Sequence, residues 1–277
     1  MPSVSDWANW ANEGREAIER ALAEDVGSGD ITTDSCIAPD LQAEARFVAK
    51  QSMTVAGVEL LPLIFRDAIL LKQSSDRVID GEALAIVRGS ARLLLTRERV
   101  ALNFLQRLSG VATLAAKFVA AVEGTGAKIL DTRKTTPGLR MLEKMAAAAG
   151  GVVNHRLGLY DAILIKNNHI RLAGGVRKAI EGAAKTGKPI EIEVRTRAEI
   201  EDALAAGVTR ILLDNMTPGQ AANEIEFIGR RVQTEISGGI TLENVRAYAE
   251  AGPDFISSGA ITHSAAAVDI NCGIHAV

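Results

Sequence analysis

Short apolar runs recur along the second half of the chain, and helical patterns separate them. The runs occupy 128–130, 162–165, 190–194, 210–213, 233–236 and 254–256. Amphipathic segments with helical spacing fill the later gaps, at 174–185, 197–206, 218–230 and 242–251. A strand followed by a helix at intervals of about twenty residues predicts parallel βα units. Such units favour a compact, incomplete α/β barrel, although periodicity alone does not separate a barrel from an open doubly wound sheet.

A different pattern covers residues 1–109. An apolar stripe at helical spacing over 17–22 predicts a helix, and the breaker that starts at Gly27 predicts its end. Four apolar segments predict strands, at 43–50, 53–56, 68–71 and 83–87. From Arg92 the helical period returns, and it continues past Gly110 to residue 122. We therefore expect a mixed α/β unit that leads through a long helix into the barrel.

Composition narrows the class of protein. Of 277 residues, 47% are hydrophobic and 23% are charged, which is typical of a globular protein. The 31 Lys and Arg against 34 Asp and Glu give a net charge of −3, so no general basic field favours nucleic acid or an anionic membrane. No apolar stretch reaches the roughly 18 residues of a membrane span. The segment with Asp6 and Glu13 lacks signal-peptide features, and Cys36 and Cys272 match no metal-ligand spacing, so we expect a cytoplasmic protein with reduced thiols.

Polar or glycine-rich residues follow nearly every strand of the predicted barrel. In such barrels the carboxyl ends of the strands meet at one rim, where the chemistry takes place. The segments concerned are 131–134, 154–156, 166–169, 214–215, 237–239 and 257–260, together with Glu191 and Glu193 inside a strand. Each alone would be read as a solvated loop or a helix cap. Their joint placement favours a single binding site.

Two of these segments predict a phosphate site. Ser237-Gly238-Gly239 and, about twenty residues later, Ser258-Gly259-Ala260 leave backbone N–H groups unobstructed. Loops after the last strands of a barrel commonly bind phosphate, although ordinary βα turns also need small residues.

The charged residues at the rim complete this interpretation. Five basic side chains are expected there: Arg133, Lys134, His155, Arg156 and Lys166. Such a cluster requires a highly anionic ligand, because arginine pairs with carboxylates and lysine with phosphate. Glu193 and Asp214 add two carboxylates, which beside phosphates indicate a divalent cation, most often Mg²⁺, or hydrogen bonds to ribose hydroxyls.

These segments closely resemble the quinolinate phosphoribosyltransferases, also called carboxylating nicotinate-nucleotide pyrophosphorylases. The resemblance covers nearly the whole chain. In order, the matching segments are 24–33 (EDVGSGDITT), 97–103 (RERVALN), 108–113 (LSGVAT), 131–135 (DTRKT), 154–158 (NHRLG), 165–169 (IKNNH), 213–215 (LDN), 237–239 (SGG) and 259–264 (GAITHS).

The resemblance implies a type II phosphoribosyltransferase fold. It has an N-terminal α/β sandwich over 1–109, joined by the tail 269–277, and an open α/β barrel over 110–268. The implied reaction joins quinolinate to phosphoribosyl pyrophosphate (PRPP) and gives nicotinate mononucleotide, pyrophosphate and CO2 in de novo NAD synthesis. It uses Mg²⁺. The implied assembly is a homodimer, or a multiple of dimers, with shared active sites.

The resemblance also assigns roles by motif match. Arg133, His155, Arg156 and Lys166 would surround the two quinolinate carboxylates, with His155 either donating a proton or orienting a carboxylate. The implied catalytic residues are Lys134, which would reach the PRPP phosphates, and Glu193 and Asp214, which would serve the ribose and the metal, directly or through substrate or water. Ser237, Gly238, Gly239, Ser258, Gly259 and Ala260 would hold the 5′-phosphate. Arg99 would enter the site of the neighbouring subunit.

The chain departs from the family pattern at Met145, Asn167 and Arg195, which leaves the shape of the pocket open. Two alternatives to this function are weighed. A barrel group linked to molybdenum transport shares the Thr-Arg-Lys and His-Arg-Leu-Gly segments, but tends to lack the Asn before His-Arg and the Lys-x-Asn-His run, both of which occur here. A non-catalytic phosphate-ligand binding protein would not need Glu193 and Asp214 together.

Overall fold

The structure is a computed structural model that describes residues 7–277. Asp6, on which part of the signal-peptide expectation rests, lies outside the described residues. Contacts divide the chain into two compact units: 1–116 with 135–151 and 261–277, and 117–134 with 152–260. The expected boundary at residues 109 and 110 falls inside the continuous helix α4 (Ala91–Ala121), and that division into domains stays a prediction.

The first unit contains a four-stranded antiparallel sheet in the order β12-β1-β5-β3. Its strands are β1 (Gln42–Ala49), β3 (Ala68–Leu70), β5 (Ala83–Ser90) and β12 (Ile270–Ala276). Alternate residues of β1 are buried, from Ala43 to Ala49, as a strand with one face on a core requires. The last strand of the fold pairs with this one, from Ala43 opposite Ala276 to Ala49 opposite Ile270. A separate pair joins β2 (Met53–Thr54) to β4 (Arg77–Val78).

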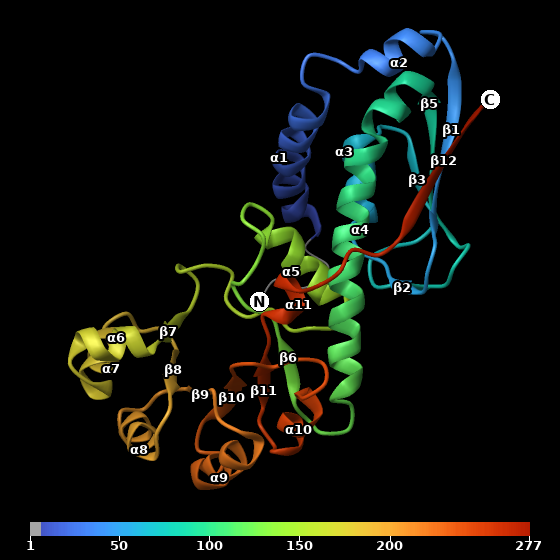
Figure 1. Cartoon of the computed structure of the whole chain (residues 1–277). Helices are drawn as coiled ribbons and strands as arrows, with labels where there is room; N and C mark the ends of the chain where they lie inside the picture. The colour runs from blue at the N-terminus through green and yellow to red at the C-terminus, as the bar shows by residue number, and fades with distance from the viewer. Residues whose placement is uncertain (1–6) are drawn as a thin grey trace. The chain divides into compact units, whose positions relative to one another are not determined.

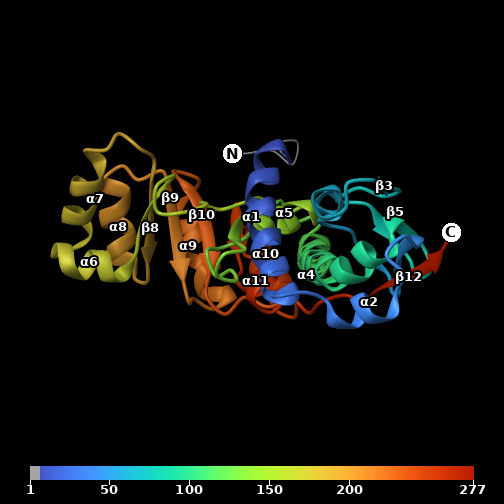
Figure 2. The ribbon, with the colours of Figure 1, turned by 90° about the horizontal axis from the view of Figure 1, so that it is seen from above.

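Helices accompany this sheet, and α4 runs beside it in Figures 1 and 2. They are α1 (Trp7–Val26), α2 (Ile31–Cys36), the 3-10 turn η1 (Val58–Leu60), α3 (Leu61–Ile64), α4 and α5 (Arg140–Ala149), while α11 (Ala260–His263) lies at the unit boundary. Gly110 does not interrupt α4. A Cβ at this position would lie 2.1 Å from the carbonyl oxygen of Ala266, so the glycine allows the chain to approach the helix closely.

The second unit is built on a six-stranded parallel sheet in the order β6-β11-β10-β9-β8-β7. Its strands are β6 (Lys128–Leu130), β7 (Ile163–Ile165), β8 (Ile190–Val194), β9 (Arg210–Asp214), β10 (Gln233–Ser237) and β11 (Phe255–Ser257). From β7 to β11 the order never reverses, whereas a doubly wound sheet reverses at its switch point. The predicted open barrel is therefore confirmed. Its gap lies between β6 and β7, where Val153 forms one parallel bridge with Leu130.

Helices follow the barrel strands along the sheet, as Figures 1 and 2 show. They are α6 (Asn167–Ala173), α7 (Val176–Ala184), α8 (Arg197–Ala205), α9 (Pro218–Ile228) and α10 (Val245–Glu250). Thr196 and Thr217 begin α8 and α9 with capping boxes, in which each hydroxyl accepts a backbone N–H three residues later. Among the helices within residues 7–277, none is long and apolar enough to cross a membrane.

Candidate active site

The expected site residues other than Arg99 all belong to the second unit. The carboxyl ends of parallel strands meet at one rim of a barrel, so residues at these ends lie near one another. Glu193 and Asp214 stand near the carboxyl ends of β8 and β9, and Ser237 ends β10. These residues therefore lie at the predicted rim, whereas Arg99 is an exposed residue of α4 in the first unit and its role stays a prediction.

The two rim carboxylates have partners from neighbouring segments. Arg195 donates to Oδ2 of Asp214 from both Nε, at 2.9 Å, and Nη2, at 2.7 Å. The amide nitrogen of Asn167 donates a short hydrogen bond to Oε1 of Glu193. Burial and the nearby charge of Asp214 raise the pKa of Glu193, and the charge of Lys166 opposes this shift. Two of the three departures from the family pattern, Asn167 and Arg195, are thus the partners of these carboxylates.

A buried aspartate fixes the segment that carries His155 and Arg156. Asp131, directly after β6, is fully buried and accepts the side-chain amide of Asn154 at 2.6 Å and the backbone N–H of His155 at 2.8 Å. Burial and the charge of Arg133 lower the pKa of Arg156. In addition, Nε of Arg133 is buried without a hydrogen-bond partner among the described residues. Two neighbouring guanidinium groups, one with a buried unsatisfied donor, fit an anionic ligand.

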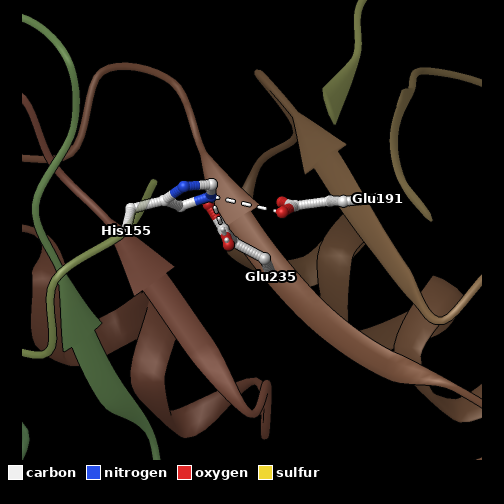
Figure 3. Close-up of side chains that lie close together, drawn as sticks. All are labelled: His155, Glu191 and Glu235. Atoms are coloured by element: carbon white, nitrogen blue, oxygen red, sulfur yellow. Dashed lines mark ion pairs between the residues drawn. The ribbon is translucent and has the colours of Figure 1, made fainter. Parts of the chain in front are cut away.

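The ring of His155 points toward the side chains of Glu191 and Glu235 (Figure 3). Its Nε2 lies 3.2 Å from Oε2 of Glu191 and 3.5 Å from Oε2 of Glu235. Both glutamates are buried. The backbone N–H of Arg156 donates to Nδ1 of the ring at 2.7 Å. Both ring nitrogens therefore have partners within the protein.

Burial alone would lower the pKa of His155, but the hydrogen bonds to Glu191 and Glu235 outweigh it and raise the pKa to about 9. Burial raises the pKa of Glu191. In Glu235 the effect of burial is outweighed by the contact with His155, and the pKa is lowered. The three groups thus share their charge as one buried network.

The positions of His155, Glu191 and Glu235 would also allow them to bind a metal ion. However, Nη1 of Arg210 lies 3.4 Å from Oε2 of Glu235 and 3.8 Å from Oε2 of Glu191. This guanidinium is held over the ring of Phe255, 4.1 Å from its centroid. Because Arg210 and His155 already pair with both carboxylates, we assign the cluster as a buried ion-pair network. The oxygen ligands that Mg²⁺ prefers are better supplied by Glu193 and Asp214 at the rim.

The serine- and glycine-containing loops differ in how open they are. A Cβ on Gly238 would lie 2.3 Å from Oδ1 of Asn215, and the φ of Gly238 is 104°, so glycine is required there. Around a Cβ on Gly239 there would be no atom within 4 Å, and the residue is exposed to solvent. Ser258 has structural partners: its N–H donates to Leu130 O and its hydroxyl to Ile240 O.

Five residues of this site had no individual role assigned from the sequence: Asp131, Asn154, Glu191, Arg210 and Glu235. Asp131 and Asn154 nevertheless lie in segments expected at the rim, and Glu191 was noted in its strand. The available signal was the presence of charged residues inside strands of a parallel sheet, which normally read as continuous apolar runs. Glu191, Arg210 and Glu235 all violate that rule. Lys134 and Lys166 are exposed, as residues that meet a ligand from solvent can be.

The fold is an open α/β barrel, and its rim places several cations beside two carboxylates. A site of this kind suits a ligand that carries phosphate and carboxylate groups. Family models described as the N-terminal and C-terminal domains of quinolinate phosphoribosyl transferase match residues 30–109 and 111–272. The chain belongs to this family, and the predicted type II fold is confirmed.

Individual relatives agree with this assignment. The chain is 41% identical to the chloroplastic carboxylating nicotinate-nucleotide pyrophosphorylase of Arabidopsis thaliana, over 94% of this chain and 82% of the relative. It is similar to the solved structure of nicotinate-nucleotide pyrophosphorylase from Francisella tularensis, with a TM-score of 0.92, 35% identity and coverage of 96% and 97% of the two chains. The crystal structure of NadC from Streptococcus pyogenes gives a TM-score of 0.89 at 39% identity, with coverage of 95% and 96%.

Proposed function

We propose that this protein transfers the phosphoribosyl group of PRPP to quinolinate. The products are nicotinate mononucleotide, pyrophosphate and CO2, in de novo NAD synthesis. The observation that carries this proposal is the Arg133–Arg156 pair, in which burial and the charge of Arg133 lower the pKa of Arg156, and Nε of Arg133 has no hydrogen-bond partner within residues 7–277. A dicarboxylate with a planar ring would supply the missing acceptors, since guanidinium groups bind carboxylates in a fixed planar geometry.

The transfer step depends on charge at the ribose. The pyridine nitrogen attacks the ribose carbon that bears pyrophosphate, and positive charge builds up on the ribose in an oxocarbenium-like transition state. Glu193 and Asp214 stabilise that charge, because preorganised carboxylates act where the charge develops. The positive charge of Lys134 stabilises the negative charge that builds up on the departing pyrophosphate. Mg²⁺, when bound, neutralises the pyrophosphate. Glu193 and Asp214 are the residues proposed to hold it, directly or through substrate or water.

Loss of CO2 needs no dedicated base. When the carboxylate beside the nitrogen leaves as CO2, its electron pair stays on the ring carbon next to the cationic ring nitrogen, which stabilises it. A proton from solvent water then takes the place of CO2 on that carbon. We propose that His155 orients the neighbouring Arg156 rather than supplying this proton, which is supported by the partners of both its ring nitrogens.

The 5′-phosphate is proposed to bind at Ser237, Gly238, Gly239, Gly259 and Ala260, with Ser258 supporting the second loop. The open backbone at Gly239 favours this position. Backbone N–H groups that face solvent bind phosphate without a charged side chain.

Release of CO2 from carboxyl-labelled quinolinate, in the presence of PRPP and Mg²⁺, tests the function. We expect release that depends on both additions. Arg133→Ala should raise the KM for quinolinate at least about tenfold, because hydrogen bonds to charged groups contribute roughly 1.5–3 kcal/mol. Arg171→Ala, which changes an exposed arginine of α6, is the matched control. A protein that binds PRPP without releasing CO2 would instead support the non-catalytic alternative.

The assembly is proposed to be a homodimer or a multiple of dimers, in the cytoplasm. Two free cysteines, Cys36 and Cys272, agree with a reducing compartment. Arg99 is proposed to complete the active site of the other subunit, which is supported by its exposure on α4. Mixing Arg99→Ala with Lys134→Ala protein tests this, because one site of each mixed dimer would contain neither change.

Random exchange makes half of the dimers mixed, so roughly a quarter of wild-type activity should return. Each variant must be nearly inactive alone, and mass spectrometry must confirm that subunits have exchanged. Recovery near zero in confirmed mixed dimers would place Arg99 in its own subunit's site or outside any site.

A further inference from the structure

Arg195 is hydrogen-bonded to the carboxylate of Asp214, which the proposed mechanism needs for the ribose and the metal. Its Nε and Nη2 both donate to the same atom, Oδ2 of Asp214, at 2.9 and 2.7 Å. Its Nη2 also lies 3.9 Å from Oε1 of Glu193. One guanidinium group therefore faces both rim carboxylates, and supplies a positive charge where a bound cation would otherwise lie.

The backbone of Arg195 is hydrogen-bonded to the next helix, whereas its side chain is largely exposed to solvent. Arg195 directly follows β8, and its backbone N–H donates to Oε2 of Glu199 at 2.7 Å in the cap of α8. Its side chain is 55% exposed, while that of Asp214 is 11% exposed. The guanidinium can therefore turn toward solvent without any change in the backbone of the rim, and Asp214 stays in place at the end of β9.

The guanidinium of Arg195 and a divalent cation cannot both bind the same oxygen of Asp214. Asp214 Oδ2 accepts two N–H donors, and a divalent cation or a ribose hydroxyl would need the same oxygen. The amide of Asn167 likewise holds Oε1 of Glu193. Oδ2 of Asp214 therefore becomes available to a ligand only when the Arg195 side chain moves away from it.

We propose that Arg195 is an internal counter-ion of Asp214 that competes with Mg²⁺ and PRPP for the rim carboxylates. The inference rests on the proposed function, in which Glu193 and Asp214 meet the ribose and the metal. Arg195 keeps the two neighbouring carboxylates compensated in the free protein. Binding of PRPP with Mg²⁺ displaces its guanidinium, so the lost ion pair weakens the apparent affinity.

Calorimetric titration of the full-length protein with PRPP in excess Mg²⁺ tests the competition. Arg195→Gln removes the charge and keeps a polar side chain of similar shape. Because an exposed ion pair contributes little, its loss should tighten the apparent Kd by only about 1.4- to 5-fold. Arg197→Gln is the matched control, since Arg197 pairs with Glu224 and Phe227 and should leave the Kd unchanged. Arg195→Lys should fall between the wild type and Arg195→Gln.

An unchanged or weaker affinity in Arg195→Gln would overturn the proposal, and a weaker one would show Arg195 to be a PRPP ligand. A second titration uses Mn²⁺ alone, followed by electron paramagnetic resonance of the free ion. Arg195→Gln should bind Mn²⁺ more tightly than both the wild type and Arg197→Gln, and equal binding by all three would contradict the competition. If the wild type neither binds PRPP nor converts quinolinate, the proposed function fails, while the Mn²⁺ titration still decides the role of Arg195.

Discussion

His155 should make the stability of the protein depend on pH in the alkaline range. The pKa of the ring is raised from 6.5 to about 9 in the folded protein by Glu191 and Glu235. A raised pKa in the folded state means that the contribution is fully present below pH 6.5 and is lost as the pH rises through 9. The difference between the two pKa values corresponds to about 3 kcal/mol of unfolding free energy.

The environment of Nδ1 limits this magnitude. The backbone N–H of Arg156 donates to that nitrogen, so a second ring proton has to displace this hydrogen bond. About 3 kcal/mol is therefore an upper value. A net hydrogen bond contributes about 1 kcal/mol, which leaves roughly 2 kcal/mol as the expected loss for the wild type between pH 6 and pH 9.5.

Urea unfolding at these two pH values measures the loss, with His155→Gln as the test variant and His275→Gln, an exposed histidine of β12, as the control. The wild type and the control should lose the same stability between pH 6 and 9.5. His155→Gln should lose roughly 2 kcal/mol less over the same range. Its unfolding free energy at pH 6 should be lower than that of the wild type, because the two buried glutamates then have Arg210 as their cationic partner without His155. Equal losses in His155→Gln and the wild type would refute the ion-pair network as the source of the pH dependence.

Three further predictions concern the site and the core. Asp214→Asn should lower kcat by about a hundredfold while quinolinate binding stays within a few-fold, because the lost charge acts mainly in the transition state; steady-state kinetics with a separate binding titration would contradict this if binding fell and turnover did not. Nicotinate should be used at least about a hundredfold less efficiently than quinolinate, because it leaves a cation of the Arg133–Arg156 pair uncompensated; comparable kcat/KM values would exclude the carboxylate assignment. Gly110→Ala should lower the unfolding free energy by about 1–3 kcal/mol or more, since its Cβ would meet the Ala266 carbonyl oxygen at 2.1 Å; an unchanged urea midpoint would show that the chain at Ala266 yields freely.

Local periodicity predicts the regular parts of this fold well. The barrel strands and their helices follow from alternating short apolar runs and amphipathic segments, because each βα unit is formed by residues close in sequence. The order of the strands is not encoded in this way, so the doubly wound alternative could be excluded only from the observed order of the paired strands. Helix α5 was not predicted. The residue pattern also predicted no strand at β12, whose partner β1 lies more than 200 residues away, although the family resemblance assigned the tail 269–277 to the first domain.

The site was predicted less completely than the fold. Arg133, Arg156, Glu193 and Asp214 were placed at the rim because residues at strand ends share one edge of a barrel. Glu191, Arg210 and Glu235 were missed as site residues, since a charge in sequence is ordinarily read as a solvated side chain. These three residues lie on different strands, and the sequence does not show that their charges meet in space. For the same reason Arg195 could be noted as unusual, whereas its contact with Asp214 could not be foreseen.

The pairing of β12 with β1 has a consequence for synthesis of the protein. The ribosome makes β1 first and β12 only after every strand of the barrel, so the sheet of the first unit stays incomplete while the barrel emerges. Throughout that interval β1 has one unpaired edge, and exposed strand edges are sites of mispairing with other chains. We expect nascent chains to need protection at this edge until residues 270–276 have left the ribosome.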